Sequence, residues 1–289
     1  MLSNSASIRT TALTFILFCP AAFMASPASA ASLVTFVSGQ GTDSGSCASP
    51  AHACRTFAFA LGVTSAGGEI KALDPANYGR VTINQSVSIT GVQGASINGA
   101  GNNAILVNAG ANDVVNISDL TLDGKKAGSN GLVVARVGSL NVRNCVVRNY
   151  TSDGIHIAPP SGTTFFRFEN VESSENGANG FYFNAKNSAV SNGVLDHVKL
   201  HHNASYGLEA DRDSNSATLN LVVNDSEATN NSIGIYSGAQ GKFVIHRSVS
   251  TNNAYGLYVN TQMGSTGDNL VYGNTTADLA GSTFTVTPK

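Results

Sequence analysis

The stretch NNSIGIYS, residues 230–237, is one of four closely similar phrases in this chain. The others are NGANGFYF at 176–183, NASYGLEA at 203–210 and NNAYGLYV at 252–259. Each begins with asparagine and has glycine at its fifth position. Recurrence of one phrase at spacings in the twenties indicates an architecture in which every repeat forms one coil and stacks on the next.

The recurring glycine sets the register of the repeat. After it, the first and third residues are mostly apolar, and the second and fourth are more often polar, which is the alternation of a short strand. The dense leucine pattern of leucine-rich repeats and the long period of helical repeats are both absent. The chain is therefore predicted to be all-β, a single-stranded right-handed parallel β-helix of roughly eight coils. The aligned glycines are Gly131, Gly154, Gly180, Gly207, Gly234 and Gly256.

The asparagines of the repeat have a structural explanation. Asparagine tolerates the left-handed backbone conformation of tight corners and, when stacked, forms ladders of side-chain hydrogen bonds. We therefore expect Asn176, Asn203, Asn230 and Asn252 to align at one corner of successive coils. This interpretation assigns the asparagines to the fold and not to chemistry.

The start of the chain has the pattern of an export signal. An apolar run over residues 11–24 is followed by Ala28-Ser29-Ala30, a small-x-small cleavage site before Ala31. We expect residues 1–30 to be a signal peptide, residues 31–67 an N-terminal cap and residues 68–289 the β-helix. The mature protein would be secreted or periplasmic, with no membrane span, because no later segment approaches about 20 consecutive apolar residues.

Charge and cysteine content restrict the partners and cofactors. The net charge is −2 and 12% of residues are charged, which argues against nucleic acid as a partner. No zinc spacing, cofactor motif or calcium-binding nonapeptide occurs, so no cofactor or metal site is predicted, and calcium is left open without a motif to place it. Cys47 and Cys54 are expected to pair in an oxidising compartment, and Cys145 to be a buried thiol. The oligomeric state is left open.

A resemblance enters at the N-terminus. The segment TFVSGQGTDSGSCASPAHACRTFAFAL, residues 35–61, with PANYGRVTINQSVSITG at 75–91, resembles the opening of exported bacterial right-handed β-helix proteins of the pectate-lyase-like superfamily. The resemblance implies a capping helix at about residues 55–64, with Phe57, Ala60 and Leu61 over the open end of the first coil. A Cys47–Cys54 bridge would then hold that cap in place.

The resemblance also implies a choice of activities. Members of the superfamily are often polysaccharide lyases, polygalacturonases, epimerases or phage tailspikes. The Gly-His-Gly and Arg-Ile-Lys elements of polygalacturonase-like enzymes and the Asp-Pro-His of alginate epimerases do not occur here. The resemblance therefore predicts the fold and leaves the activity open.

Strand alternation after the glycines predicts one outward stripe. Aromatic rings with polar tips beside carboxyl and amide groups suit sugar rings, which present apolar faces and hydroxyl edges. The alternative is that outward tyrosines are simply good strand formers. The residues assigned to polysaccharide binding are His156, Tyr182, Asn184, Lys186, Tyr236, Tyr258 and Asn260.

Two carboxyl groups in or beside the stripe are candidate catalytic residues. Glu209 and Asp211 are two residues apart on one strand face, about 6.6 Å between Cα atoms, within the range for paired glycosidase carboxyls. Arg212 would pair with an acidic sugar or with Asp213, and either Arg212 or Lys186 could be the base of a lyase. We predict an exported protein that binds polysaccharide or cell-surface glycan along one outward face, and whether it also processes that glycan, as a lyase or a glycoside hydrolase, is left open. The alternative is a non-catalytic structural or adhesive surface protein.

Overall fold

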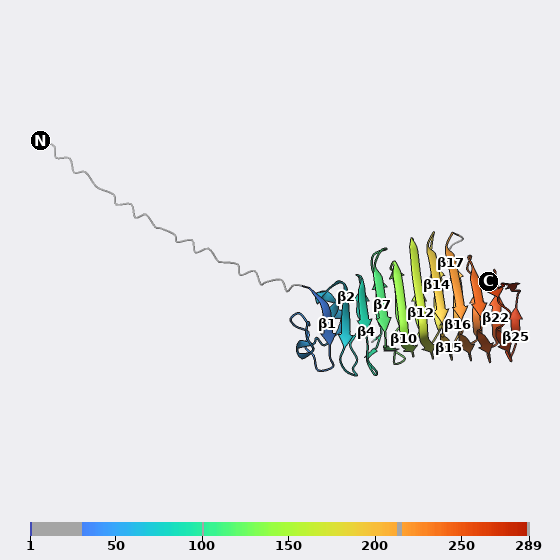
Figure 1. The fold of residues 1–289 in the computed structure, drawn as a ribbon, viewed down its shortest axis with the longest axis horizontal. Helices are drawn as coiled ribbons and strands as arrows, with labels where there is room; N and C mark the ends of the chain where they lie inside the picture. Colours follow the sequence, from blue (N-terminus) through green and yellow to red (C-terminus); the bar gives the residue numbers. More distant parts are fainter. Residues whose placement is uncertain (2–30, 100, 213–215, 288–289) are drawn as a thin grey trace.

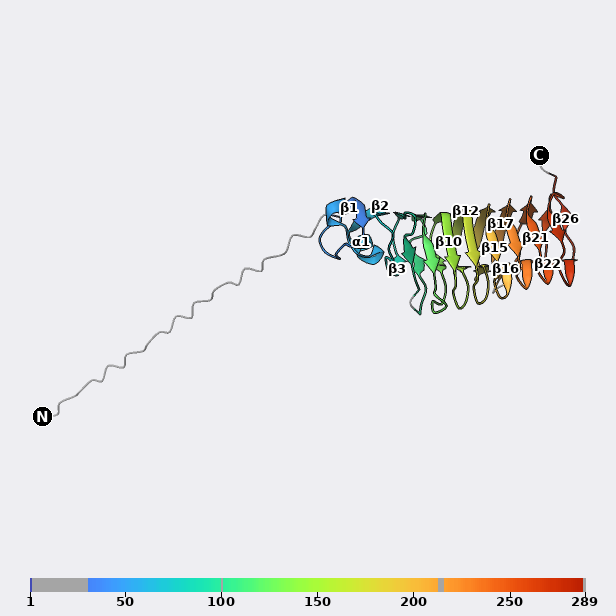
Figure 2. The ribbon, with the colours of Figure 1, turned by 90° about the horizontal axis from the view of Figure 1, so that it is seen from below.

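The computed structural model describes residues 1, 31–99, 101–212 and 216–287, and there the strands stack side by side along one long axis (Figures 1 and 2). All strand pairs are parallel, so the predicted parallel β-helix is confirmed. The expected signal peptide, residues 1–30, lies outside the described residues apart from Met1. Within the described part, no helix is long and apolar enough to cross a membrane.

One face is a nine-stranded sheet with one strand from each coil. Its strands are β3 (Val81–Ile83), β6 (Ile105–Asn108), β9 (Leu132–Arg136), β11 (Ile155–Ile157), β13 (Phe181–Ala185), β16 (Tyr206–Arg212), β19 (Ile233–Ser237), β22 (Tyr255–Val259) and β25 (Ala277–Ala280). The residues that follow the aligned glycines pair directly from coil to coil, for example Phe181 with Leu208 and Leu208 with Ile235. The register predicted from the glycine is therefore confirmed for this face.

A 17-stranded sheet forms the rest of the wall. The long strands β10 and β12 continue around a corner, whereas neighbouring coils divide into two strands there. The strands are β1 (Ser32–Val37), β2 (Thr64–Ala72), β4 (Val87–Thr90), β5 (Ser96–Ile97), β7 (Val114–Ser118), β8 (Thr121–Asp123), β10 (Ser139–Arg148), β12 (Thr163–Ser174), β14 (Val190–Asp196), β15 (Lys199–His201), β17 (Thr218–Asn224), β18 (Glu227–Thr229), β20 (Phe243–His246), β21 (Val249–Thr251), β23 (Gly264–Ser265), β24 (Leu270–Tyr272) and β26 (Phe284–Thr285).

The asparagine ladder exists, but half of its predicted members are wrong. Asn176 donates to Asn203 Oδ1 at 2.9 Å, and Asn203 donates to Asn231 Oδ1 at 3.1 Å. Asn231 donates in turn to Asn253 Oδ1 at 3.3 Å. The ladder is buried, so Asn231 and Asn253 hold the places that had been assigned to Asn230 and Asn252.

Asn230 and Asn252, which are not in the ladder, form the turn at the corner. Asn230 and Asn252 have φ of 56° and 57°, in the left-handed region, and their side chains are exposed. His202 precedes Asn203 in the same conformation, with φ of 55°. The coils that contribute to the ladder therefore make this corner with one left-handed residue followed by one ladder asparagine. The later coils have one residue fewer between the ladder asparagine and the glycine, which explains why counting back from the glycine fails there.

The N-terminal end is capped as predicted. Helix α1 (Phe57–Val63) buries Phe57, Ala60 and Leu61, and the Thr56 side chain accepts a hydrogen bond from the Phe59 N–H. A short 3₁₀ helix, η1 (Pro50–His52), lies between the two bridged cysteines. Strand β1 pairs with β2, so the cap belongs to the same wall as the coils. Figure 2 shows α1 beside β1 and β3 at this end.

Both cysteine predictions are confirmed. Cys47 and Cys54 form a disulfide with 5.3 Å between Cα atoms, and Cys145 is a buried free thiol. Apart from the asparagine ladder and a few buried hydroxyl groups, the interior is mostly apolar, with Phe166 stacked on Phe183 and Phe168 edge-on to Phe181.

Candidate functional site

The outward stripe predicted from the sequence is one continuous column of the nine-stranded sheet. Each member pairs directly with the next, from β11 through β22, and each is half-buried. We call this column the aromatic row: His156, Tyr182, Glu209, Tyr236 and Tyr258. The His156 and Tyr182 rings lie 4.8 Å apart, and the Tyr236 and Tyr258 rings 5.7 Å apart. The sheet therefore presents a row of rings with one carboxyl group in its middle.

A second column lies beside the row, and the sequence analysis missed it. It consists of the residue directly before each aligned glycine, and it includes Asp153, Asn179, Tyr206 and Tyr255. The Tyr206 ring lies 5.5 Å from Tyr236, so the two columns share contacts. The signal in the sequence was the polar or aromatic residue immediately before several of the repeated glycines. Strict alternation counted from the glycine assigns that position to the interior, so these residues were not predicted to lie beside the row.

Glu209 is the carboxyl group at the centre of the row. Its Oε2 accepts a hydrogen bond from the Asn179 side-chain amide at 2.8 Å. Burial raises the pKa of Glu209 to about 7, and the negative charges of Asp211 and Asp153 raise it further. The hydrogen bond from Asn179 acts in the opposite direction and lowers this pKa. A carboxyl group that retains its proton near neutral pH can donate it to a ligand.

Asp153 is a second acidic group with a perturbed pKa. It is 5% exposed, and burial raises its pKa to about 6 despite the hydrogen bond from the Asn179 N–H. His156 Nδ1 lies 3.4 Å from Asp153 Oδ2. Asn179 thus joins two carboxyl groups from different coils, and Asp153 is also adjacent to the first ring of the row.

The predicted site residues that follow the aromatic row, at the fourth position after each glycine and just beyond it, lie only partly beside one another. Asn184 pairs with Asp211 across β13 and β16, so these two are neighbours. Asn260 donates to the Tyr236 hydroxyl at 3.3 Å. Lys186 is exposed just after β13. The side chain of Arg212, and Asp213 altogether, lie outside the described residues, so the roles of Arg212 stay predictions.

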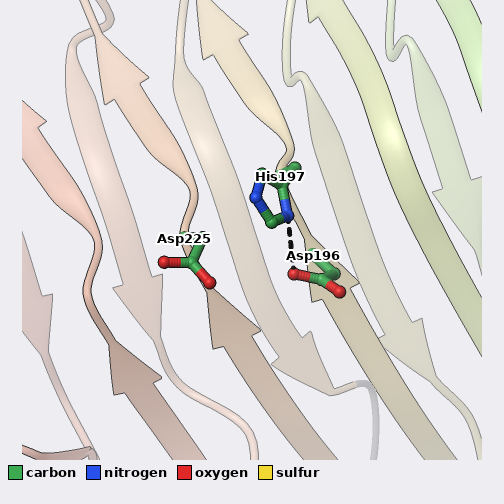
Figure 3. Close-up of side chains that lie close together, drawn as sticks. All are labelled: Asp196, His197 and Asp225. Atoms are coloured by element: carbon green, nitrogen blue, oxygen red, sulfur yellow. Dashed lines mark hydrogen bonds and ion pairs between the residues drawn. The ribbon is translucent and has the colours of Figure 1, made fainter.

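A cluster of two aspartates and a histidine lies on the 17-stranded sheet, away from the aromatic row. Figure 3 shows Asp196, His197 and Asp225 close together, with His197 Nδ1 2.9 Å from Asp196 Oδ1. Arg167 lies 2.9 Å from the other Asp196 oxygen, and Arg247 lies 2.6 Å from Asp225. The hydrogen bond from Arg247 lowers the pKa of Asp225 to about 2. Arginines already compensate both carboxylates, so this cluster is explained as a surface ion-pair network.

The stacked parallel coils, the capped end and the aromatic face define a protein of the parallel β-helix class. The chain belongs to the right-handed β-helix family, whose pattern matches residues 103–287. No curated protein matches the chain in sequence.

Three solved structures are similar in fold. Pectate lyase Pel9A superposes with a TM-score of 0.50 and 16% identity, over 84% of this chain and 80% of the lyase. The A-module of the Azotobacter vinelandii mannuronan C-5 epimerase AlgE4 gives a TM-score of 0.42 and 14% identity, over 76% of this chain and 89% of the module. The A-module of the epimerase AlgE6 gives 0.34 and 13%, over 77% and 92%. At 16% identity the likeness to the lyase concerns the fold alone.

Proposed function

We propose that this chain binds a polysaccharide along the aromatic row and that Glu209 acts on the bound polymer as an acid. The observation that carries the proposal is the position of Glu209, a carboxyl group with a raised pKa, in register between Tyr182 and Tyr236. Successive coils are about 4.8 Å apart, so the rings follow one extended ligand. The pectate lyase that shares the fold acts, by its name, on a polymer of this class.

The proposed chemistry is cleavage with two carboxyl groups. Glu209 retains a proton up to about pH 7 and would donate it to the oxygen of the bond being cleaved. Asp211, two residues further along β16, is the second carboxylate, and it would take a proton from the water that attacks the sugar carbon while the proton from Glu209 leaves with the departing hydroxyl. The two Cα atoms are about 6.6 Å apart in a regular strand, and paired carboxyls in glycoside hydrolysis are about 5–9.5 Å apart.

The disulfide supports the proposed location. The Cys47–Cys54 disulfide is the kind of bond that persists in oxidising compartments. Together with the signal-peptide pattern of residues 1–30, it supports a secreted or periplasmic protein whose partner is an extracellular or cell-surface glycan.

A ring-deletion experiment tests binding. The double variant Tyr182→Ala, Tyr236→Ala should lose affinity for the polysaccharides that a glycan array identifies with the wild type, by about tenfold or more if each ring contributes about 1 kcal/mol. Tyr272→Ala is the matched control, because Tyr272 is 72% exposed on the 17-stranded sheet, away from the row. Equal affinity of the wild type and the double variant would remove the row as a binding site.

A separate experiment tests catalysis. Glu209→Gln keeps the size of the side chain and removes its proton, so product release from a bound polymer should fall while binding persists. If Glu209→Gln releases product as fast as the wild type, Glu209 is not the acid. If the wild type binds polymer and releases nothing, the non-catalytic adhesive function is the correct one.

A further inference from the structure

Two histidines meet at the corner that follows β15. His201 is the last residue of that strand, and His202 comes directly after it. Successive side chains of a strand point to opposite faces, so neighbouring histidines normally diverge. At this corner His202 has the left-handed conformation, with φ of 55°, and strand alternation ends. The two Nδ1 atoms therefore come together, 3.0 Å apart.

The surroundings of His201 decide which of its ring nitrogens is available to a ligand. Its Nε2 lies 3.5 Å from Glu172 Oε1, and a carboxylate on that side favours the tautomer that carries the proton on Nε2. The Nδ1 of His201 then presents a lone pair to the Nδ1 of His202. Two lone pairs at this distance repel each other, so the contact needs a proton or a cation between the nitrogens. A ring that directs its other N–H at a carboxylate is also the usual arrangement of a metal-binding histidine.

The distance between the two nitrogens fits a metal ion. Two imidazole nitrogens bound at about 2.05 Å are about 2.9 Å apart when the angle at the metal is a right angle, and about 3.3 Å apart at the tetrahedral angle. The observed 3.0 Å is closer to the right angle of a tetragonal site. Tetragonal sites with nitrogen and oxygen ligands are typical of copper(II) and nickel(II), and copper(II) is the more tightly bound of the two.

The charge around the corner favours a cation. Glu172 and Glu227 flank Lys199 in the ladder of neighbouring coils, and Glu175 has the left-handed corner position one coil before His202. Three carboxylates therefore lie near one ammonium group. Within the described part of the chain, no third histidine, cysteine or carboxylate completes a compact ligand set with the pair. Solvent oxygens would therefore fill the other positions around a metal ion.

We propose that His201 and His202 bind one copper(II) ion through their Nδ1 atoms. The proton that occupies the contact in the free protein moves to the Nε2 of His202, an exposed residue, so both rings stay neutral. The buried Asn203, which directly follows the pair and belongs to the asparagine ladder, fixes the corner before the ion binds. The inference is independent of the proposed function, because β15 belongs to the 17-stranded sheet and not to the face that carries the aromatic row.

Titration of the chain, free of any affinity tag, with copper(II) chloride at neutral pH tests the site. Calorimetry should show one ion bound per chain with a Kd in the micromolar range or below. Electron paramagnetic resonance of the complex should give a tetragonal spectrum with hyperfine splitting from two nitrogens. Zinc should bind at least about tenfold more weakly than copper, which follows the general order of affinities of divalent metals.

The repeat itself supplies matched variants that should fold. His202→Asn introduces the residue that two other coils have at this corner, Asn230 and Asn252, and asparagine tolerates the left-handed conformation. His201→Thr introduces the residue that the next coil has at the paired position, Thr229. Each variant should lower the affinity for copper at least about tenfold, because a chelating pair becomes a single ligand, and each should remove one nitrogen from the spectrum.

His197→Ala is the control, because His197 forms a compact group of possible metal ligands with Asp196 and Asp225 on the same sheet. This variant should bind copper with the affinity of the wild type. The inference is overturned if the wild type binds no copper in the micromolar range, if zinc binds as tightly as copper, or if His197→Ala loses the ion. It is also overturned if either His201→Thr or His202→Asn binds copper as tightly as the wild type.

Discussion

Asn179 donates its side-chain amide to Glu209 Oε2 at 2.8 Å, and its backbone N–H lies 3.3 Å from Asp153 Oδ1. One residue of the middle coil thus links carboxyl groups of the coils on either side. The stacking of the β-helix creates this arrangement, because Asp153, Asn179 and Glu209 are far apart in the chain. The arrangement leads to predictions about pH, and the corners and the cap lead to predictions about stability.

The first prediction concerns the dependence of stability on pH. Glu209 binds its proton more tightly in the folded chain, since its pKa rises from 4.5 to about 7. The folded state therefore binds more protons between these values, and the contribution of Glu209 to the free energy of unfolding falls as the pH rises through this window. Glu209→Gln should be more stable than the wild type at pH 8 by about 1 kcal/mol after allowance for solvent screening.

Urea denaturation of both proteins at pH 4 and pH 8 measures this difference, which should vanish at pH 4. Glu227→Gln, at an exposed position of β18, is the control and should not reproduce the pH dependence. A wild type more stable than Glu209→Gln at pH 8 would contradict the assigned environment of Glu209.

The second prediction concerns the coupling between the carboxyl groups. Negative charges on Asp211 and Asp153 both raise the pKa of Glu209. Asp211→Asn and Asp153→Asn should therefore each lower that pKa toward its ordinary value. Carbon-13 NMR titration of the glutamate carboxyl groups gives the value directly, and an unchanged Glu209 titration in both variants would show that the three groups do not interact.

The third prediction separates the two asparagines of one corner. Asn231→Ala removes a buried ladder member, so donors of Asn203 and the Leu200 carbonyl lose their partner. It should lower the free energy of unfolding by about 2–4 kcal/mol. Asn230→Gly keeps the left-handed conformation available and should change stability by less than about 0.5 kcal/mol. Urea denaturation compares the two, and the reverse order would restore the register predicted from the sequence.

The fourth prediction concerns the cap. The Cys47–Cys54 bridge closes a short loop, and chain entropy gives a contribution of about 2 kcal/mol for a loop of that length. The double variant Cys47→Ala, Cys54→Ala should be destabilised by that amount and should no longer respond to a reductant. Thermal unfolding with and without dithiothreitol checks this, and a wild type that is indifferent to the reductant would show that the bridge adds nothing to the cap.

Part of the architecture was predictable because its signals are local. The repeated glycine with alternating residues after it gave the parallel coils, the register of the nine-stranded sheet and the aromatic row. Side chains alternate with period two along a strand, and identical phrases stack in register. The helix over the first coil and the Cys47–Cys54 pair were likewise readable, the helix from the resemblance of residues 35–61 and the pair from its close spacing.

The corners and the acid at the centre of the row were decided by the tertiary structure. Asn231 and not Asn230 joins the ladder because the corner loop is one residue shorter in that coil, and only the hydrogen bonds to Asn203 and Asn253 fix which asparagine turns inward. The high pKa of Glu209 depends on burial and on charges that the coils bring together. Electrostatic interactions and burial act through space, so strand alternation alone could place Glu209 in the row but could not give its protonation state.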